Sequence, residues 1–529
     1  MQPHGMNLIG SERSGRGPTF NAIDPSTSLP LPGDFHEGTA EEADRALKLA
    51  DAAFQTFRKT DGKTRAALLD AIAANIEALG DALLERANQE TGLGLPRLTG
   101  ERARTGFQLR MFARLAEEGS WVDARIDRAM PDRKPAPRPD MRRLLVGVGP
   151  VVSFSSSNFP LAISVAGNDL VSAFAAGCPI VVKNHPNHPG TSEMIAGAIY
   201  KAIADLKLPP GIFSMINGRG HEIGLTLVKH PLAKAAAFTG SLRGGRALFD
   251  AANARPEPIP VFAEMGSVNP VFFLPGALAE RAEKIAEGYR ASLTLGVGQF
   301  CTNPGVVFGL KGEPTQKFLA TASKLVEESA PGTMLYGGLR DAYDKEVQKL
   351  AAVPGVAVAA RSKAAVDKAK THGQPILLST DVKTFLKNEV LKEEAFGPAS
   401  LFVAGESKEE LLAAAQSLEG SLTATVHGTP EDLKEYADLI AILEQKVGRL
   451  VFNGFPTGVE VVPSQQHGGP YPSTTDARTT SVGTAAIQRF VRPVAYQDFP
   501  QSALPAELRD ENPLGIWRLV DGKVTKEAV

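Results

Sequence analysis

Hydrophobic positions in the N-terminal part of the chain recur at helical spacing. Thr39 is followed by two glutamates, a pattern typical of a helix start. Apolar residues then recur three or four positions apart, at Ala43, Leu47, Ala50 and Phe54. The same pattern predicts helices near 62–79, 81–92 and 100–118. We therefore expect the chain to about residue 120 to be helical.

From Arg143 the pattern changes to short apolar runs separated by helices. Residues 144–154 are apolar and glycine-containing. A helix is predicted after Asn158-Phe159-Pro160 and runs to Ala176, and a buried strand is predicted at 180–183. A strand–helix–strand order implies parallel strands joined by a crossover helix. Further strands are predicted at 212–216, 235–238 and 259–263. This part of the sequence predicts a doubly wound α/β sheet.

A second α/β region is predicted from about residue 277 to 475. Its expected strands lie near 375–378, 399–403, 423–426 and 449–452. A short helix near 483–490 and a strand near 491–497 follow. Residues 128–141 are rich in proline and basic residues, which excludes a helix or a central strand and indicates an exposed arm.

Composition excludes several classes of protein. Lysine and arginine number 57 against 59 acidic residues, which gives no reason to expect a nucleic-acid or membrane partner. No apolar run is long enough to span a bilayer, and the N-terminus lacks a secretory signal pattern. Two cysteines cannot form a disulfide framework, so we expect a cytoplasmic protein. His185, His188 and His221 are not grouped with other metal-ligand residues, and we predict no metal.

Cys301 is the candidate nucleophile. It follows Gln299 and Phe300 and precedes Thr302-Asn303-Pro304, a small, polar and turn-forming environment. Cys178, in contrast, lies at the entry to an apolar strand. A presented thiol in a chain of this size favours covalent catalysis through a thiolate. The alternative is an inert buried cysteine.

Six segments in a fixed order resemble the aldehyde dehydrogenase superfamily, over about residues 20 to 500. They are 157–160 (Ser-Asn-Phe-Pro), 182–183 (Val-Lys), 238–241 (Phe-Thr-Gly-Ser) with 245–246 (Gly-Arg), 264–266 (Glu-Met-Gly), 299–301 (Gln-Phe-Cys) and 393–398 (Glu-Glu-Ala-Phe-Gly-Pro). The resemblance implies a doubly wound cofactor domain, an α/β catalytic domain and a small β oligomerisation arm, in a homodimer or homotetramer. The expected boundaries are 1–120 with 148–276, then 277–475, and 121–147 with 476–529, respectively.

The resemblance also implies a reaction. Cys301 attacks an aldehyde, and the Asn158 side chain and the Cys301 N–H stabilise the oxyanion. Hydride transfer then leaves a thioester, and Glu264 activates the water that releases a free acid. We expect partial burial to raise the pKa of Glu264. From the residues alone, Asn158 is also compatible with a turn, and Glu264 with a solvated strand end.

Cofactor binding does not use the usual Gly-x-Gly-x-x-Gly fingerprint. The resemblance implies that Gly240, Ser241 and Gly245 hold a pyrophosphate at a helix N-terminus. It also implies that Lys183 binds the adenosine ribose, and that the nicotinamide ribose contacts are made by Glu394 and Phe396. Taken alone, these residues are also compatible with a plain helix entry, a surface lysine and a solvated acidic turn.

The sequence favours NADP, with NAD possible. Pro186 stands where NAD-preferring members of the family often have a glutamate, so a repulsive carboxylate is missing. Arg219 is a candidate partner of the 2′-phosphate, since arginine binds phosphate bidentately. Arg219 is equally compatible with an ordinary surface loop.

Departures from the commonest pattern, at Ser157, Ser267 and Val306, resemble the branch of NADP-type fatty aldehyde and α-ketoglutaric semialdehyde dehydrogenases. In that branch His467 is a candidate for proton transfer, or a structural loop histidine. We expect Phe159 and Phe455 to line the substrate mouth.

The substrate assignment depends on Arg104, which is predicted to bind a carboxylate but is also compatible with a solvated helix face. We predict oxidation of α-ketoglutaric semialdehyde to α-ketoglutarate. The alternatives are a broad medium-chain or fatty aldehyde dehydrogenase, a cofactor-independent thiol esterase and a non-catalytic dinucleotide-binding protein.

Overall fold

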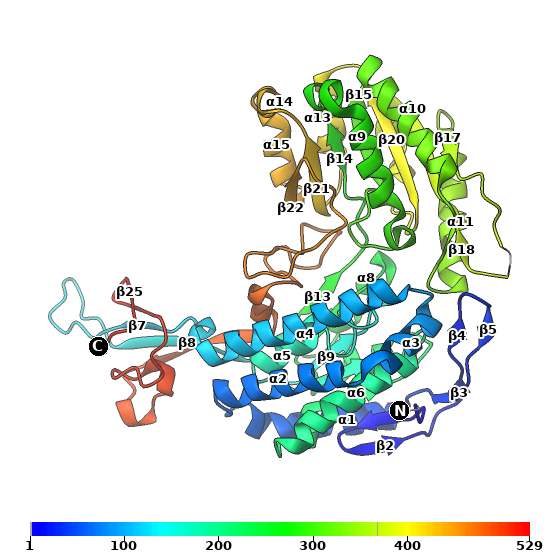
Figure 1. The fold of residues 1–529 in the computed structure, drawn as a ribbon. Helices are drawn as coiled ribbons and strands as arrows, with labels where there is room; N and C mark the ends of the chain where they lie inside the picture. The colour runs from blue at the N-terminus through cyan, green and yellow to red at the C-terminus, as the bar shows by residue number, and fades with distance from the viewer. Residues whose placement is uncertain (1–2, 368) are drawn as a thin grey trace.

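The structure is a computed structural model that describes residues 3–367 and 369–529. It contains two seven-stranded sheets flanked by helices, and a five-stranded sheet that projects from one side (Figure 1). The predicted α/β class is confirmed. No helix within the described residues combines the length and the apolarity needed to cross a membrane.

The first sheet has the strand order β13-β12-β9-β10-β11-β1-β2. Strands β9 to β13 are parallel, and β1 adds antiparallel to β11. The bounds are β1 Asn7–Ile9, β2 Glu12–Ser14, β9 Val151–Phe154, β10 Ile180–Lys183, β11 Phe213–Ile216, β12 Ala235–Thr239 and β13 Val261–Glu264.

Alternate residues of these strands face two separate apolar clusters. One contains Val151 and Val182, the other Val152 and Val181. Because helices supply the rest of each cluster, both faces of the sheet are covered. The helices are α1 Ala40–Phe57, α2 Gly62–Ala78, α3 Gly80–Thr91, α4 Leu95–Glu118, α5 Asn168–Ala175, α6 Pro189–Asp205, α7 Glu222–Lys229 and α8 Leu242–Asn253.

The second sheet has the order β17-β19-β20-β15-β14-β21-β22, and only β17 runs antiparallel to its neighbour among these described strands. Its strands are β14 Val271–Phe273, β15 Val306–Leu310, β17 Ala357–Arg361, β19 Ile376–Asp381, β20 Ala399–Gly405, β21 Ser421–His427 and β22 Val447–Phe452. Its helices are α9 Pro275–Thr294, α10 Glu313–Glu328, α11 Gly337–Ala351, α12 Val382–Lys387, α13 Lys408–Ser417, α14 Pro430–Glu435 and α15 Ala437–Glu444. The predicted domain boundaries stay a prediction, although β14 pairs with this sheet while preceding residue 277.

The projecting sheet joins two distant parts of the chain. Its order is β23-β8-β7-β24-β25, with bounds β7 Arg125–Asp127, β8 Met141–Gly147, β23 Val491–Gln497, β24 Arg518–Val520 and β25 Lys523–Thr525. Strand β24 runs parallel to β7, so the C-terminal tail covers an edge that β7 would otherwise expose. Leu508 and Ile516 of the tail are buried against Ile126 and Leu144.

Two predictions about secondary structure were wrong. The first 36 residues contain short strands rather than helix, including β3 Thr19–Phe20, β4 Ile23–Asp24, β5 Leu29–Pro30 and β6 Phe35–His36. Strands of two or three residues are too short to show a two-residue alternation. The helix expected directly after Pro160 begins only at Asn168. Before it, the N–H groups of Leu161 and Ala162 donate to the buried Glu101 carboxylate, at 2.8 and 3.0 Å, instead of to helix carbonyls.

Candidate active site

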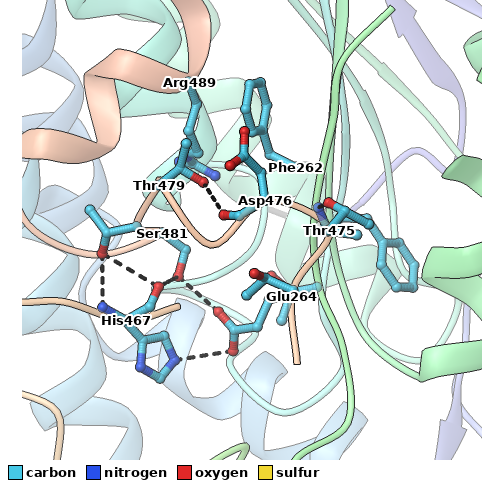
Figure 2. Close-up of a pocket in the computed structure, with 13 residues that line it drawn as sticks. Phe262, Glu264, His467, Thr475, Asp476, Thr479, Ser481 and Arg489 are labelled. Carbon is cyan, nitrogen blue, oxygen red and sulfur yellow. Dashed lines mark hydrogen bonds and ion pairs between the residues drawn. The ribbon is translucent and has the colours of Figure 1, made fainter. Parts of the chain in front are cut away.

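Three predicted residues meet between the two large sheets. Glu264 is the last residue of β13, Cys301 follows a short 3-10 helix at Leu295–Gly298, and His467 lies in the loop after β22. His467 Nε2 lies 3.4 Å from Cys301 Sγ and 3.1 Å from Glu264 Oε1. Figure 2 shows the imidazole directed at the Glu264 carboxylate, with the Ser481 hydroxyl on its other oxygen, at 2.8 Å.

The Glu264 carboxyl is only 5% exposed, and its environment lowers its pKa. Burial acts to raise the pKa, but the charge of His467 and hydrogen bonds from His467, Ser481 and Cys301 together outweigh burial. The expectation of a raised pKa was therefore wrong. Sequence reasoning counted the burial of a strand-end carboxyl but could not see the donors that surround it.

The Cys301 thiol has a pKa well above the ordinary value. Burial is the main cause, and the carboxylates of Glu264 and Glu394 add to it, while Arg104 acts in the opposite direction. Without substrate, the sulfur is therefore a protonated thiol at neutral pH. A nucleophile at this position needs a base, and both His467 and Glu264 are within reach of the sulfur.

The backbone around Cys301 is held by contacts that sequence reasoning missed. The buried Asn269 side chain donates from Nδ2 to the carbonyls of Cys301 and Asn303, both at 2.9 Å. Gly298 has φ +66°, and a Cβ there would come within 2.3 Å of the Gly397 backbone. The available signal was an Asn-Pro pair five residues after Glu264, which was not weighed.

Asn158 is buried beside the same loop, where its Nδ2 donates to the Gln299 carbonyl at 3.1 Å. Arg97, which sequence reasoning also missed, donates to the Asn158 carbonyl at 2.6 Å. The Arg97 guanidinium lies 4.9 Å from the Phe159 ring centroid and 4.8 Å from that of Phe300. An arginine in the first turn of a helix gave no sequence signal for this role.

Arg104 of α4, the arginine predicted to bind the substrate carboxylate, lies beside this site. It donates to the Val459 carbonyl at 3.2 Å and lies 5.7 Å from the Phe159 ring, and its buried Nε has no hydrogen-bond partner within the described residues. Arg102 donates to Gly80, and Arg110 pairs with Glu77.

Phe455, the other predicted mouth residue, does not contact Phe159 among the aromatic pairs of the described residues. It packs against the His427 ring at 4.8 Å and beside Gly288, within the apolar cluster of the second sheet. Phe159 instead pairs edge-to-face with Phe300 at 5.5 Å. The two phenylalanines therefore face different surroundings.

The predicted pyrophosphate loop lies at the N-terminus of α8. The Ser241 hydroxyl caps this helix by accepting from Gly244 N–H at 3.2 Å. A Cβ at Gly240 would come within 2.6 Å of the Phe238 ring, and one at Gly245 within 2.7 Å of Met265. N–H groups at a glycine-lined helix start with no acidic residue in its first turn fit a phosphate group.

The predicted ribose contacts come from the end of β10 and from the segment before β20. Lys183 ends β10, and burial lowers its pKa to about 8 although the Glu37 carboxylate opposes this effect. Burial raises the pKa of Glu394 to about 8, and the half-buried Phe396 follows two residues later. Arg219 is 58% exposed and donates to Glu37 Oε1 at 2.7 Å. Together with the glycine cradle, these groups fit a dinucleotide.

Comparisons with known proteins show the family to which the chain belongs. A model of the aldehyde dehydrogenase family matches residues 12–493. The chain is 49% identical over 526 residues to α-ketoglutaric semialdehyde dehydrogenase 2 of Azospirillum brasilense, covering 99% of this chain and 100% of that one. It is 45% identical over 525 residues to the α-ketoglutaric semialdehyde dehydrogenase of Acinetobacter baylyi, covering 99% of each.

Solved structures show the same fold. Betaine aldehyde dehydrogenase of Staphylococcus aureus in complex with NAD+ has a TM-score of 0.81 at 20% identity, covering 94% of this chain and 95% of that chain. A 1-pyrroline-5-carboxylate dehydrogenase has a TM-score of 0.79 at 22% identity, covering 93% and 92%. The chain belongs to the aldehyde dehydrogenase family, whose enzymes oxidise aldehydes with a nicotinamide cofactor.

The charges around Cys301 predict how its alkylation by iodoacetamide depends on pH. Because the Glu264 carboxylate raises the thiol pKa, Glu264→Gln is expected to shift the pH profile of alkylation to lower pH. Mass spectrometry locates the adduct and distinguishes Cys301 from the fully buried Cys178. Glu393→Gln is the matched control, since Glu393 is exposed and pairs with Lys349. A profile that is the same in Glu264→Gln and in the parent enzyme would contradict this account.

Proposed function

We propose that this enzyme oxidises α-ketoglutaric semialdehyde to α-ketoglutarate. The observation that carries the reaction class is the convergence of Cys301, Glu264 and His467 beside Asn158. The substrate is supported by the two relatives that bear this name, at 49% and 45% identity over nearly the whole chain. It is supported further by the partly buried cation of Arg104 beside the site.

The first step is attack by sulfur on the aldehyde carbon. The thiol proton passes to the Glu264 carboxylate, whose Oε1 is held by a hydrogen bond from His467 Nε2 at 3.1 Å. The free Nδ2 hydrogen of Asn158 and the Cys301 N–H stabilise the oxyanion. The Asn158 side chain is held in place for this role, because its other Nδ2 hydrogen is donated to the Gln299 carbonyl. The backbone carbonyl of Asn158 accepts a hydrogen bond from Arg97.

A bound nicotinamide cofactor would supply the hydride acceptor, and the hemithioacetal would then become a thioester on Cys301. Glu264 releases the thiol proton to solvent and, again as a carboxylate, removes a proton from water. The water attacks the thioester carbon, the thiolate leaves and takes the proton back from Glu264, and the carboxylic acid is released. Ser481 and His467 fix the two oxygens of Glu264, so that the carboxylate is oriented before water arrives. A Glu264 carboxyl with a lowered pKa is ionised at neutral pH and ready to accept a proton.

Glu264 takes part in both halves of the reaction, and its removal shows which half depends on it more. We expect Glu264→Gln to lower steady-state turnover by about 10²–10⁴-fold, the range for loss of a general base. A burst of reduced cofactor, equal to the enzyme concentration, is expected to precede the slow phase if thioester hydrolysis is the step most affected. Cys301→Ala should give neither burst nor turnover. Oxidation by Cys301→Ala at the parent rate would overturn the proposal.

Arg104 is proposed to bind the substrate carboxylate. The loss of hydrogen bonds to a charged group costs about 1.5–3 kcal/mol, so Arg104→Ala should lower kcat/KM for the semialdehyde by about 10–100-fold. An uncharged medium-chain aldehyde should lose far less. Arg102→Ala is the matched control, since Arg102 lies on the same helix but donates to Gly80. Equal losses for both substrates would favour a broad aldehyde dehydrogenase.

We propose NADP as the preferred cofactor, with NAD also used. In this proposal Arg219 binds the 2′-phosphate of NADP. In the structure, Arg219 pairs with Glu37, whose carboxylate also lies near Lys183. The phosphate would therefore replace Glu37 as the partner of Arg219. A free Glu37 carboxylate is equally able to accept from the ribose hydroxyls of NAD, so the balance between these two residues decides the preference.

Two substitutions test this balance. Arg219→Ala should lower kcat/KM for NADP by about 10-fold and leave that for NAD nearly unchanged, because only NADP has the charged group. Glu37→Gln should raise NADP use relative to NAD, since it removes a repulsive carboxylate. If the ratio of the two kcat/KM values is the same in the parent enzyme and both variants, the NADP proposal fails.

The proposed assembly is a homodimer or homotetramer formed by strand addition. Strand β22 is an outer strand of the second sheet with exposed Leu450 and Phe452, and β23 is an outer strand of the projecting sheet. Both therefore offer unpaired edges among the described strands. Sedimentation measures the assembled mass.

The two free cysteines, Cys178 and Cys301, support a reducing cytoplasmic location.

A further inference from the structure

The cluster of Cys301, Glu264 and His467 has a property that aldehyde oxidation does not require. One sulfur, one imidazole nitrogen and one carboxylate oxygen all lie within 4.8 Å of one another. Two of the three residues are buried, and the third is partly buried. Thiolate, imidazole and carboxylate are also the three ligand types that Zn²⁺ prefers in proteins.

The spacing of these atoms is close to that of a coordination sphere. Zn²⁺ lies ~2.1 Å from nitrogen and oxygen and ~2.3 Å from sulfur, which places tetrahedral ligands ~3.4–3.6 Å apart. The observed separations are 3.4 Å from Cys301 Sγ to His467 Nε2, and 3.1 Å from Nε2 to Glu264 Oε1. Shifts of a few tenths of an ångström in side-chain position bring these two distances to the ideal values.

We propose that Cys301, His467 and Glu264 form an inhibitory binding site for a thiophilic divalent cation such as Zn²⁺. The ion takes the sulfur, Nε2 and one carboxylate oxygen, and a water molecule completes the tetrahedron. Binding releases the thiol proton to solvent and leaves the metal-bound sulfur unable to attack an aldehyde. The same ion occupies the oxygen of Glu264 that faces His467. Turnover therefore stops while the protein stays folded.

The charges near the cluster fit a divalent ion. The thiolate and the Glu264 carboxylate neutralise both of its charges. Glu394 and Arg104, which come from other elements, shift the pKa of the Cys301 thiol in opposite directions. Hard cations such as Mg²⁺ prefer all-oxygen ligands, so they are not expected to compete.

The same cluster lacks a support that resident metal sites have. A metal-bound histidine normally donates from its second nitrogen to a fixed acceptor. His467 Nδ1 is buried and has no hydrogen-bond partner in the described part of the chain. We therefore expect an exchangeable ion that a chelator removes, not a permanent cofactor.

Cobalt(II) tests the site without any turnover. The full-length enzyme, free of aldehyde and nicotinamide, is titrated with CoCl₂, and the expected signal is a thiolate-to-cobalt charge-transfer band with tetrahedral d–d bands. Zn²⁺ should displace the cobalt, and EDTA should abolish both bands. In the parent enzyme, Zn²⁺ should also protect Cys301 from iodoacetamide, whereas Mg²⁺ should not. Absence of the charge-transfer band, or alkylation at the same rate with Zn²⁺, overturns the proposal.

Variants assign the ligands. Cys301→Ala and His467→Ala should each weaken binding by more than ~100-fold, since even the loss of an outer-shell partner costs ~10–100-fold. Cys178→Ala is the matched control and should keep both the cobalt spectrum and inhibition by Zn²⁺, because Cys178 lies in the core of the first sheet. A cobalt spectrum that survives in Cys301→Ala would overturn the assignment.

This result is independent of the proposed function, because the spectrum needs no substrate. An enzyme that binds cobalt but oxidises a different aldehyde would keep this inference and lose the substrate proposal. An enzyme that oxidises the semialdehyde but shows no zinc inhibition and no cobalt band would keep the substrate proposal and lose the metal-site inference.

Discussion

The site depends on a backbone contact that returns the chain from the second sheet to the first. After β22, the chain runs back to β13, where Met265 N–H donates to the Ser473 carbonyl at 2.8 Å and Thr475 N–H donates to Ala263 at 3.1 Å. These bonds flank Glu264 on both sides. Because His467 and Ser481 lie within a few residues of this contact, their side chains reach the Glu264 carboxylate. Separate sheets thereby contribute to one cluster.

A second constraint is the burial of charge. Glu264 and Glu394 lie near the Cys301 sulfur and raise the pKa of its thiol, and the Arg104 cation offsets only part of this effect. The pKa values of these two carboxyls shift in opposite directions. Glu264 accepts several hydrogen bonds, which lower its pKa, whereas Glu394 accepts fewer and burial raises its pKa to about 8. Two neighbouring carboxyls therefore hold different protonation states near neutral pH. This separation is the arrangement expected where one group must accept protons.

Much of the fold and the central cluster could be predicted from the sequence. Strands at the centre of each sheet are apolar runs bounded by turn residues, and Cys301, Glu264 and His467 were each singled out by their flanking residues. What could not be predicted depends on contacts between distant segments. Asn269 and Arg97 act on backbone carbonyls far along the chain, and a single sequence carries no signal for such bonds.

Arg97 illustrates what such a contact means for reactivity. Its guanidinium is removed from water when the chain folds, and burial lowers its pKa. The unfavourable desolvation is thus incurred once, during folding, rather than in every catalytic cycle. Since the same group bonds to the Asn158 segment and stacks on the aromatic ring that precedes the nucleophile, two loops share one rigid support. Neither loop can drift without disturbing the other, and the dipoles between them stay fixed in advance of the chemistry.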